Sequence, residues 1–136
     1  MKVYKIKGSR ISGTDYKEVN KKAQIIYREI KSKTKRRPYV RSEYFNKEKV
    51  FIDLFWQHLW QKENFRDKIR RIKLFPCAIE LIQKSKYDPQ KNSKLTKRKE
   101  VYYKFVGATK DDELFYVQIK EDLKTGNKYF ISVFPE

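Results

Sequence analysis

Cysteine, glycine and long apolar runs are all scarce in this sequence, and each shortage excludes a class of structure. Cys77 stands alone, so one chain can form neither a disulfide framework nor a zinc site built from several cysteines. The four glycines form no glycine-rich phosphate loop, and the sequence has no Ser/His/Asp arrangement with diagnostic spacing. No apolar run is long enough to span a membrane, and the opening residues, MKVYKIKGSR, lack the apolar core of a signal peptide. We therefore expect a cytoplasmic protein with no membrane partner.

Acidic residues are also few, and their distribution divides the chain. The 136 residues carry 34 Lys and Arg against 17 Asp and Glu, a net charge of +17. Residues 101–136 hold 5 basic and 6 acidic side chains, whereas the first 100 residues hold 29 and 11. Because such a charge repels itself, an anionic partner is expected. RNA is the first candidate, since neutralising phosphates releases counterions, and an acidic protein would satisfy the same charge.

The apolar residues predict how the first 100 residues fold. Val3, Tyr4 and Ile6 allow a short opening strand. Asp15 and Glu18 stand in capping-box register at the start of a predicted helix over residues 15–31. Residues 47–62, KEKVFIDLFWQHLWQK, predict the most apolar helix, at the centre of the core. Apolar residues at helical spacing also run from residue 65 to residue 82, and Pro76 is expected to split this segment into two helices.

Two basic segments and three strands complete the predicted fold. Lys31–Arg41 reads as an exposed basic loop with extended backbone at its end, and Tyr87–Glu100 as a mobile basic loop. Strands are predicted at 101–107, 113–120 and 128–134. The expected fold is α+β and a single domain, with N-terminal helices packed on one face of a C-terminal antiparallel sheet of three or more strands. The basic helical part would cover about 1–100 and the sheet about 101–136.

Alternation along the strands predicts which sheet face is open. In the middle strand, Phe115, Val117 and Ile119 form the buried side. In the last strand, Tyr129, Ile131 and Val133 alternate with Phe130, Ser132 and Phe134, and only the second set carries a small hydroxyl, so that second set is placed on the open side and the first on the buried side. The open face would then present Tyr102, Lys104, Tyr116, Gln118, Lys120, Phe130 and Ser132. Such groups suit stacking on bases and holding phosphates, although the wet face of an antiparallel sheet is polar in any case.

The tail resembles a known group of ribonucleases. Its segments FVGATKDDELFYVQIKED and NKYFISVFP are similar to the phage-associated branch of the barnase, EndoU, colicin and RelE-type ribonuclease superfamily. In that branch the C-terminal sheet ends in an aromatic–x–Ser/Thr–x–aromatic–Pro strand, a pattern matched here by Phe130, Ser132, Phe134 and Pro135. The segment RRPYVRSEYF and the helix after it look like the helical portion of small bacterial relatives.

The resemblance implies cleavage of RNA without a metal or cofactor, in which the 2′-hydroxyl attacks its own phosphate and leaves a 2′,3′-cyclic end. That chemistry needs a base, an acid and cations on the phosphate. His58 is the only side chain whose ordinary pKa lies near neutrality, although a half-buried structural histidine is the alternative. The predicted catalytic residues are His58, Lys104, Tyr116 and Ser132, of which Ser132 transfers best from the family pattern.

Arginines on either side of Tyr39 suit the backbone of a single RNA strand, unless they form a solvated charge run. The predicted RNA-binding residues are Lys35, Arg36, Arg37, Tyr39, Arg41, Gln118 and Lys120. Arginines 66, 70 and 71 are interpreted as surface charge. No metal site is predicted, because the acidic groups at 111–113 and 121–122 bracket a strand and lie on the order of 23 Å apart.

Two other functions stay open at this point. One is an RNA-binding module without catalysis, which would use the same sheet face. The other is an interaction protein whose basic surface docks an acidic partner, such as an antitoxin, an immunity protein or an anti-defence target.

Overall fold

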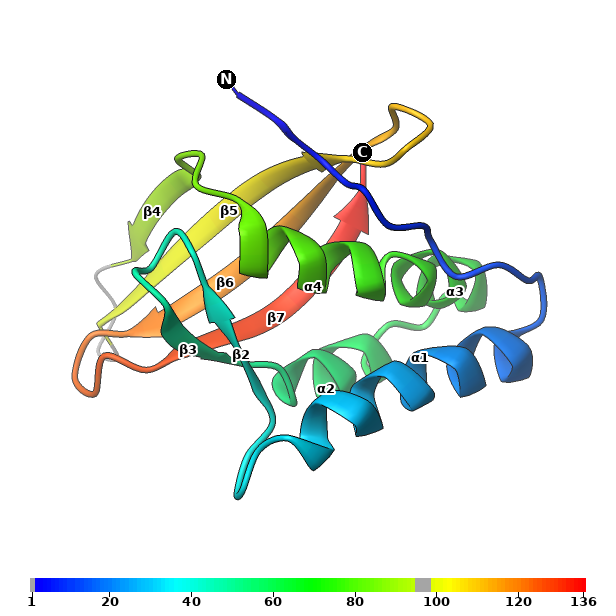
Figure 1. The fold of residues 1–136 in the computed structure, drawn as a ribbon, viewed down its shortest axis with the longest axis horizontal. Coiled ribbons are helices and arrows are strands. Elements are labelled where there is room, and N and C mark those ends of the chain that lie inside the picture. Colours follow the sequence, from blue (N-terminus) through cyan, green and yellow to red (C-terminus); the bar gives the residue numbers. More distant parts are fainter. Residues whose placement is uncertain (1, 95–98) are drawn as a thin grey trace.

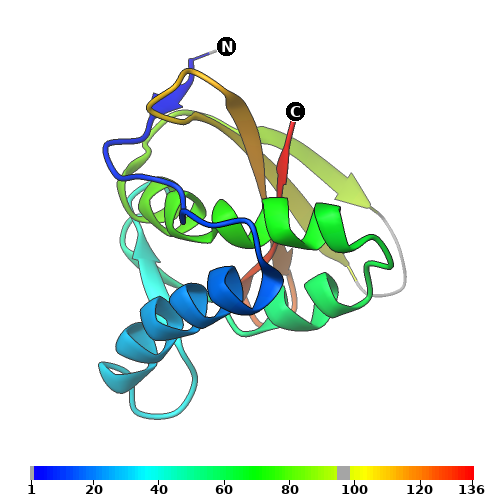
Figure 2. The same ribbon diagram turned by 90° about the vertical axis from the view of Figure 1, so that its right-hand side faces the viewer.

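A computed structural model describes residues 2–94 and 99–136, which form four helices and seven strands in an α+β arrangement (Figure 1). The helices gather on one side of the sheet, with α4 (Phe75–Lys84) crossing its face and with α2 (Leu54–Trp60) and α3 (Phe65–Lys73) beside strand β7 (Lys128–Pro135) (Figures 1 and 2). None of the helices in the described ranges has the length and apolar character needed to cross a bilayer.

The three C-terminal strands are confirmed as an antiparallel meander. They are β5 (Glu100–Ala108), β6 (Leu114–Asp122) and β7 (Lys128–Pro135). The complete sheet is mixed, however, because β1 (Tyr4–Lys5) pairs in parallel with β5, and β3 (Glu48–Phe51) pairs in parallel with β7. The prediction of a purely antiparallel sheet is therefore wrong, whereas the short opening strand is confirmed.

The helices α1 (Tyr16–Ser32), α3 (Phe65–Lys73) and α4 (Phe75–Lys84) agree with the sequence pattern. Pro76 lies in the first turn of α4, as expected for a residue that has no N–H to donate. The predicted capping box does not form. Asp15 is the N-cap of α1 but makes no side-chain cap bond, and the Glu18 carboxylate instead accepts from Lys22 at 3.2 Å.

The predicted helix over residues 47–62 is wrong in its first part. Residues Glu48–Phe51 form β3, which pairs with β2 (Tyr39–Ser42) as a hairpin, and α2 covers only Leu54–Trp60. Two non-glycine residues with positive φ, Asn46 at 56° and Lys47 at 66°, make the turn between the strands. Contacts between distant parts of the chain explain why these residues form a strand. Val50 and Phe51 are suited to extended backbone, and Val50 is fully buried where β3 pairs with β7.

The segment Tyr87–Glu100 is not the loop that its composition predicts. Residues Gln90–Lys94 form β4, which pairs antiparallel with β5 from Lys104 to Glu100. The sheet edge supplies backbone partners to β4, so this strand needs no apolar pattern of its own. Residues 95–98 of that predicted loop lie outside the described residues. Of the earlier basic segment, Tyr39 and the two residues after it are extended in β2, as predicted.

The core lies between the helices and the sheet. Rings from α2, α4 and two strands are fully buried there, namely Phe55, Phe75, Phe115 and Phe130. Phe55 stacks on Phe130 with ring centroids 4.8 Å apart and planes within 7°. Helix α2 is therefore central to the core, as its pattern predicted. Trp60, at the end of the same helix, is nevertheless 59% exposed.

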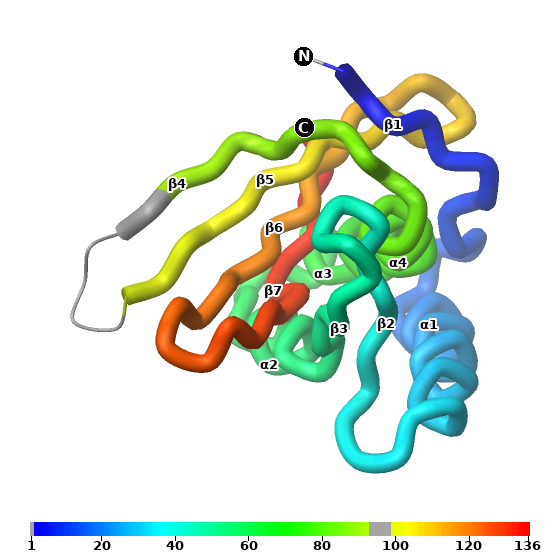
Figure 3. The backbone as a smooth tube through the Cα atoms, turned by 60° about the vertical axis from the view of Figure 1, so that its left-hand side comes forward, coloured from blue at the N-terminus to red at the C-terminus, as the bar shows by residue number. Residues whose placement is uncertain are grey.

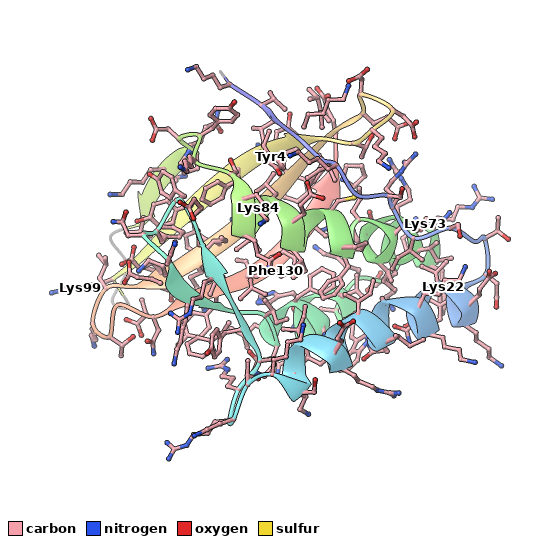
Figure 4. All side chains as sticks on the ribbon, viewed as in Figure 1. Tyr4, Lys22, Lys73, Lys84, Lys99 and Phe130 are labelled. Carbon is pink, nitrogen blue, oxygen red and sulfur yellow. The ribbon has the colours of Figure 1, made fainter. Side chains whose placement is uncertain are left out.

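A β-bulge in β7 changes the predicted sheet faces. Gln118 pairs with Ser132, but the next residue of β6, Ile119, pairs with Phe130, so Ile131 is the extra residue. Phe130 therefore points into the core, where Figure 4 shows it near the centre of the molecule, and Tyr129 joins the half-buried side. The prediction that Phe130 lies on the open face and Tyr129 on the buried face is wrong. Ser132 and Phe134 keep the predicted side.

Because the bulge points Phe130 into the core and Phe134 to the open face, replacing these two residues of β7 should lower the stability by different amounts. Phe130→Ala should lower the free energy of unfolding by about 3–5 kcal/mol, because it empties a fully buried site. Phe134→Ala should cost only about 1–2 kcal/mol, since its ring lies on the half-buried side and loses contacts with Tyr116, Arg71 and Lys104 but empties no core site. Urea titration measures both values, and Phe130→Leu replaces the alanine variant if that variant does not fold. Equal costs at the two positions would contradict the bulge.

Candidate nucleic-acid interface

The sheet side away from the core carries a contiguous set of polar and aromatic residues, which we call the open face. Each of them is half-buried and alternates with core residues along its strand. Figure 3 shows the three strands side by side, with β4 at one border and the β2–β3 hairpin at the other. Pairing places Lys104 and Ser132 on either side of Gln118, and Tyr116 opposite Phe134. The open face comprises Tyr102, Lys104, Tyr116, Gln118, Lys120, Tyr129, Ser132 and Phe134.

Arg71 of α3 reaches the open face at Ser132. Its Nη1 donates to Ser132 Oγ at 2.8 Å, and its Nε donates to Asp67 Oδ2 at 2.9 Å. The guanidinium carbon also lies 5.6 Å from the centroid of the Phe134 ring. The sequence interpretation treated Arg71 as surface charge, yet its side chain is only 16% exposed. The Asp67–Arg71 spacing of one helical turn was visible in the sequence, but not the sheet edge that this side of α3 meets.

Lys104 and Tyr116 both lie close to the Phe134 ring, which Arg71 also contacts. The Lys104 ammonium is 4.4 Å from the Tyr116 ring centroid and 5.8 Å from that of Phe134. The two rings are themselves 5.4 Å apart. The structure therefore brings three of the predicted catalytic residues, Lys104, Tyr116 and Ser132, to one place and adds Arg71 to them. We call Lys104, Tyr116, Ser132, Phe134 and Arg71 the Arg71 cluster.

A pocket of about 400 Å³ lies further along the open face. We call it the Arg37 pocket, because the Arg37 guanidinium there lies against the rings of Phe51 and Tyr129, 4.9 and 5.0 Å from their centroids, which are themselves 5.8 Å apart. Asp53 holds this guanidinium with both carboxylate oxygens, at 2.8 and 2.9 Å from Nε. Burial lowers the pKa of Arg37, but the hydrogen bond and charge of Asp53 outweigh it, so the net pKa is raised. The pocket is lined by Arg37, Leu54, Glu100, Lys120, Asp122, Lys124 and Tyr129.

His58 lies on an exposed side of α2, one turn after Leu54, which lines the Arg37 pocket. Partial desolvation, followed by the charges of Lys120 and Lys62, lowers the pKa of His58 below its ordinary 6.5. His58 is exposed, so its imidazole points away from the core, and it is close enough to the Lys120 ammonium to feel that charge. Within the described part of the chain, however, no hydrogen bond or ion pair joins His58 to the Arg71 cluster. His58 is therefore the one predicted catalytic residue that lies outside the Arg71 cluster.

The predicted RNA-binding residues of the first half line two hollows, and Tyr39 lines both of them. Lys35, Arg36, Arg37 and Tyr39 line one of about 660 Å³, together with Lys49 and other residues. Arg41 lines a different hollow of about 530 Å³ and donates to the Lys47 carbonyl at 3.0 Å. Arg37 lines both the larger hollow and the Arg37 pocket. A continuous basic and aromatic surface therefore leads from the loop before β2 onto the open face.

The acidic residues of the β5–β6 turn pair with the N-terminal segment. Asp112 lies 2.9 Å from the Lys5 ammonium, and Arg10 bridges Asp111 at 3.1 Å and Glu113 at 2.7 Å. These pairs link the turn to β1 and to the segment that follows it. No group of three or more His, Cys, Asp or Glu side chains suited to a metal ion occurs among residues 2–94 and 99–136.

Comparisons with family models, curated proteins and solved structures found no match. The chemistry of this interface is therefore inferred from its geometry.

The single histidine gives a direct test of how α2 faces the sheet. Because burial and two ammonium groups disfavour the imidazolium, the pKa of His58 should lie below 6.5 in the folded protein. Neutral His58 then favours folding above the unfolded pKa, and this contribution is lost as the pH falls through the folded pKa. In an NMR titration of the imidazole signal, Lys120→Gln should raise the pKa, whereas the matched variant Lys104→Gln should leave it unchanged. A pKa at or above 6.5, or an equal response to both variants, would contradict this placement.

Proposed function

We propose that this chain is an endoribonuclease that binds single-stranded RNA across the open face and cleaves it at the Arg71 cluster without a metal. One observation carries the proposal: Arg71 from α3, Lys104 from β5 and Tyr116 from β6 all approach the Phe134 ring, and Arg71 also donates to Ser132 of the same strand as that ring. The core does not require this arrangement, because all four polar groups lie on the other side of the sheet. The resemblance of the tail to the barnase and RelE-type superfamily supports the same chemistry.

Arg71 and Lys104 supply the positive charge that a reacting phosphate needs. A guanidinium carries five N–H donors, so the contacts of Arg71 with Asp67 and Ser132 leave it able to hold phosphate oxygens as well. The Lys104 ammonium approaches the Phe134 ring from β5, across the intervening strand β6. Cations held in place before the reaction stabilise the charge that develops on the phosphate, without further reorganisation.

In the proposed reaction, the 2′-oxygen forms a bond to its own phosphorus while the bond from phosphorus to the 5′-oxygen breaks. A base takes the proton of the 2′-hydroxyl, and an acid gives a proton to the departing 5′-oxygen. Tyr116, Lys104 and Ser132 lie where the phosphate would bind and are the groups proposed to act there. His58, with its lowered pKa, is neutral at pH 7 and can accept a proton, but it stands near Lys120 at the edge of the open face.

An RNA-binding module without catalysis is the second candidate. It is favoured by the hydrogen bond that Ser132 accepts from Arg71, because that bond leaves the hydroxyl its own proton to donate to a phosphate oxygen, which is a binding role and not a catalytic one. The aromatic and cationic groups of the open face suffice for binding in that case. An acidic antitoxin or immunity protein is a further proposed partner, because the same cations would pair with its carboxylates.

Cleavage of RNA in the presence of a chelator tests the proposal. Purified protein should cut total RNA in EDTA, with 2′,3′-cyclic phosphates at the mapped ends. Lys104→Gln and Ser132→Ala should each lower the single-turnover cleavage rate, the lysine variant by about 10²–10³-fold. Lys110→Gln, in the exposed β5–β6 turn, is the matched control and should keep full activity.

Each alternative result has a separate meaning. Full activity in both Lys104→Gln and Ser132→Ala would overturn the assignment of the Arg71 cluster, and loss of cleavage in EDTA would overturn the metal-independent reaction. Binding without any cut in either buffer would favour the non-catalytic module. Failure to bind RNA even at low salt would favour an acidic protein partner, because phosphate-driven affinity rises steeply there.

A further inference from the structure

The Arg37 pocket has the size and position of a binding subsite beside the Arg71 cluster. Its volume of about 400 Å³ falls in the range of about 300–1,000 Å³ that small-molecule sites occupy. Tyr116 of the Arg71 cluster and Lys120 of the pocket are four residues apart on β6, which corresponds to about 13 Å. A short single strand of RNA is long enough to occupy both places, whereas one nucleotide is not.

Charge and shape indicate which part of RNA would enter the pocket. Leu54 and Tyr129 supply apolar wall, while the ammonium groups of Lys120 and Lys124 give the pocket its positive charge together with Arg37. Two carboxylates, Glu100 and Asp122, also line it. Carboxylates repel a phosphate, so the interior is suited to a neutral, flat group, and the cations are suited to the phosphates on either side of that group.

The two carboxylates face each other across the β5–β6 ladder. Glu100 accepts from the Tyr102 hydroxyl at 2.8 Å and lies 3.9 Å from the Lys120 ammonium, and both contacts fall on Oε2. Asp122 accepts from the Lys124 backbone N–H at 2.9 Å through Oδ1. A carboxylate has about four lone-pair sites, so each group keeps capacity to accept further hydrogen bonds.

From this lining we infer that the Arg37 pocket is a nucleobase subsite that selects bases with an exocyclic amino group over uracil. Adenine, cytosine and guanine each present an amino group that can donate to Glu100 or Asp122, as carboxylates do accept from the cytosine amino group. Uracil presents a carbonyl oxygen where cytosine has that amino group, and two acceptors facing each other repel. The inference rests on the proposed binding of RNA to the open face, but not on its cleavage.

Binding of short 2′-O-methyl oligonucleotides tests the subsite, because they lack the 2′-hydroxyl and cannot be cut by the proposed reaction. Oligo(C) and oligo(U) of equal length carry the same phosphates, so their affinity ratio reports the base alone. By fluorescence anisotropy, the protein should bind oligo(C) about tenfold more tightly than oligo(U). Glu100→Gln and Asp122→Asn should each bring this ratio toward one, since an amide can also donate to the uracil oxygen.

Each of these variants also removes one negative charge, which strengthens binding to every sequence. Glu29→Gln makes the same change on the exposed side of α1, so it should leave the ratio as in the unchanged protein. Urea unfolding confirms that each variant folds. Equal affinity for oligo(C) and oligo(U) in the unchanged protein would overturn the subsite while leaving RNA binding intact. A preference for oligo(C) that persists unchanged in both Glu100→Gln and Asp122→Asn would do the same. No binding of either oligonucleotide at low salt would instead overturn the proposed function, and the subsite with it.

Discussion

The irregular pairing of β6 with β7 determines which side chains of the terminal strand reach the core and which reach the open face. One extra residue, Ile131, lets Phe130 and Val133 both point toward the helices. Phe130 then completes the aromatic contacts with Phe55 and Phe75 that hold α2 and α4 on the sheet. Without the bulge, β7 would lose either its core contacts or the position of Ser132, because the side-chain period of a strand is two.

The open face depends on this arrangement because the two arginines that meet it come from outside the three C-terminal strands. Arg71 arrives from α3, which the core holds against β7, and Arg37 arrives from the loop before β2. Asp67 and Asp53 fix these guanidiniums by hydrogen bonds of 2.8–2.9 Å. Net charge alone does not select this surface, since Figure 4 shows labelled lysines on widely separated parts of the molecule. Aromatic rings, a hydroxyl and fixed arginines together distinguish it.

The sequence predicts local features well and long-range pairing poorly. The three C-terminal strands, α1 and the break at Pro76 follow from alternation, helical spacing and proline chemistry. Strand β3 was missed because Val50 and Phe51 continue an apolar run into α2, and only pairing with β7 makes them a strand. Strand β4 was missed because it is polar and depends on the edge of β5.

In the candidate site, too, local features were predicted correctly and long-range contacts were not. Alternation placed Lys104, Tyr116, Gln118 and Lys120 on one face, which the structure confirms. It placed Phe130 wrongly, because an inserted residue leaves no signal in a pattern of period two. It also gave no sign that Arg71 meets Ser132, since which side of α3 approaches the sheet depends on the packing of the whole core.

The central claim is that RNA binds the open face and not the basic surface as a whole. NMR titration with a 2′-O-methyl oligonucleotide tests it most directly, by mapping which signals shift. We predict shifts at the Tyr116 and Tyr129 rings, the Ser132 amide and the ammonium groups of Lys104 and Lys120, with the outer surface of α1 unaffected. Shifts spread evenly over the lysines and arginines, or centred on α1, would contradict the account.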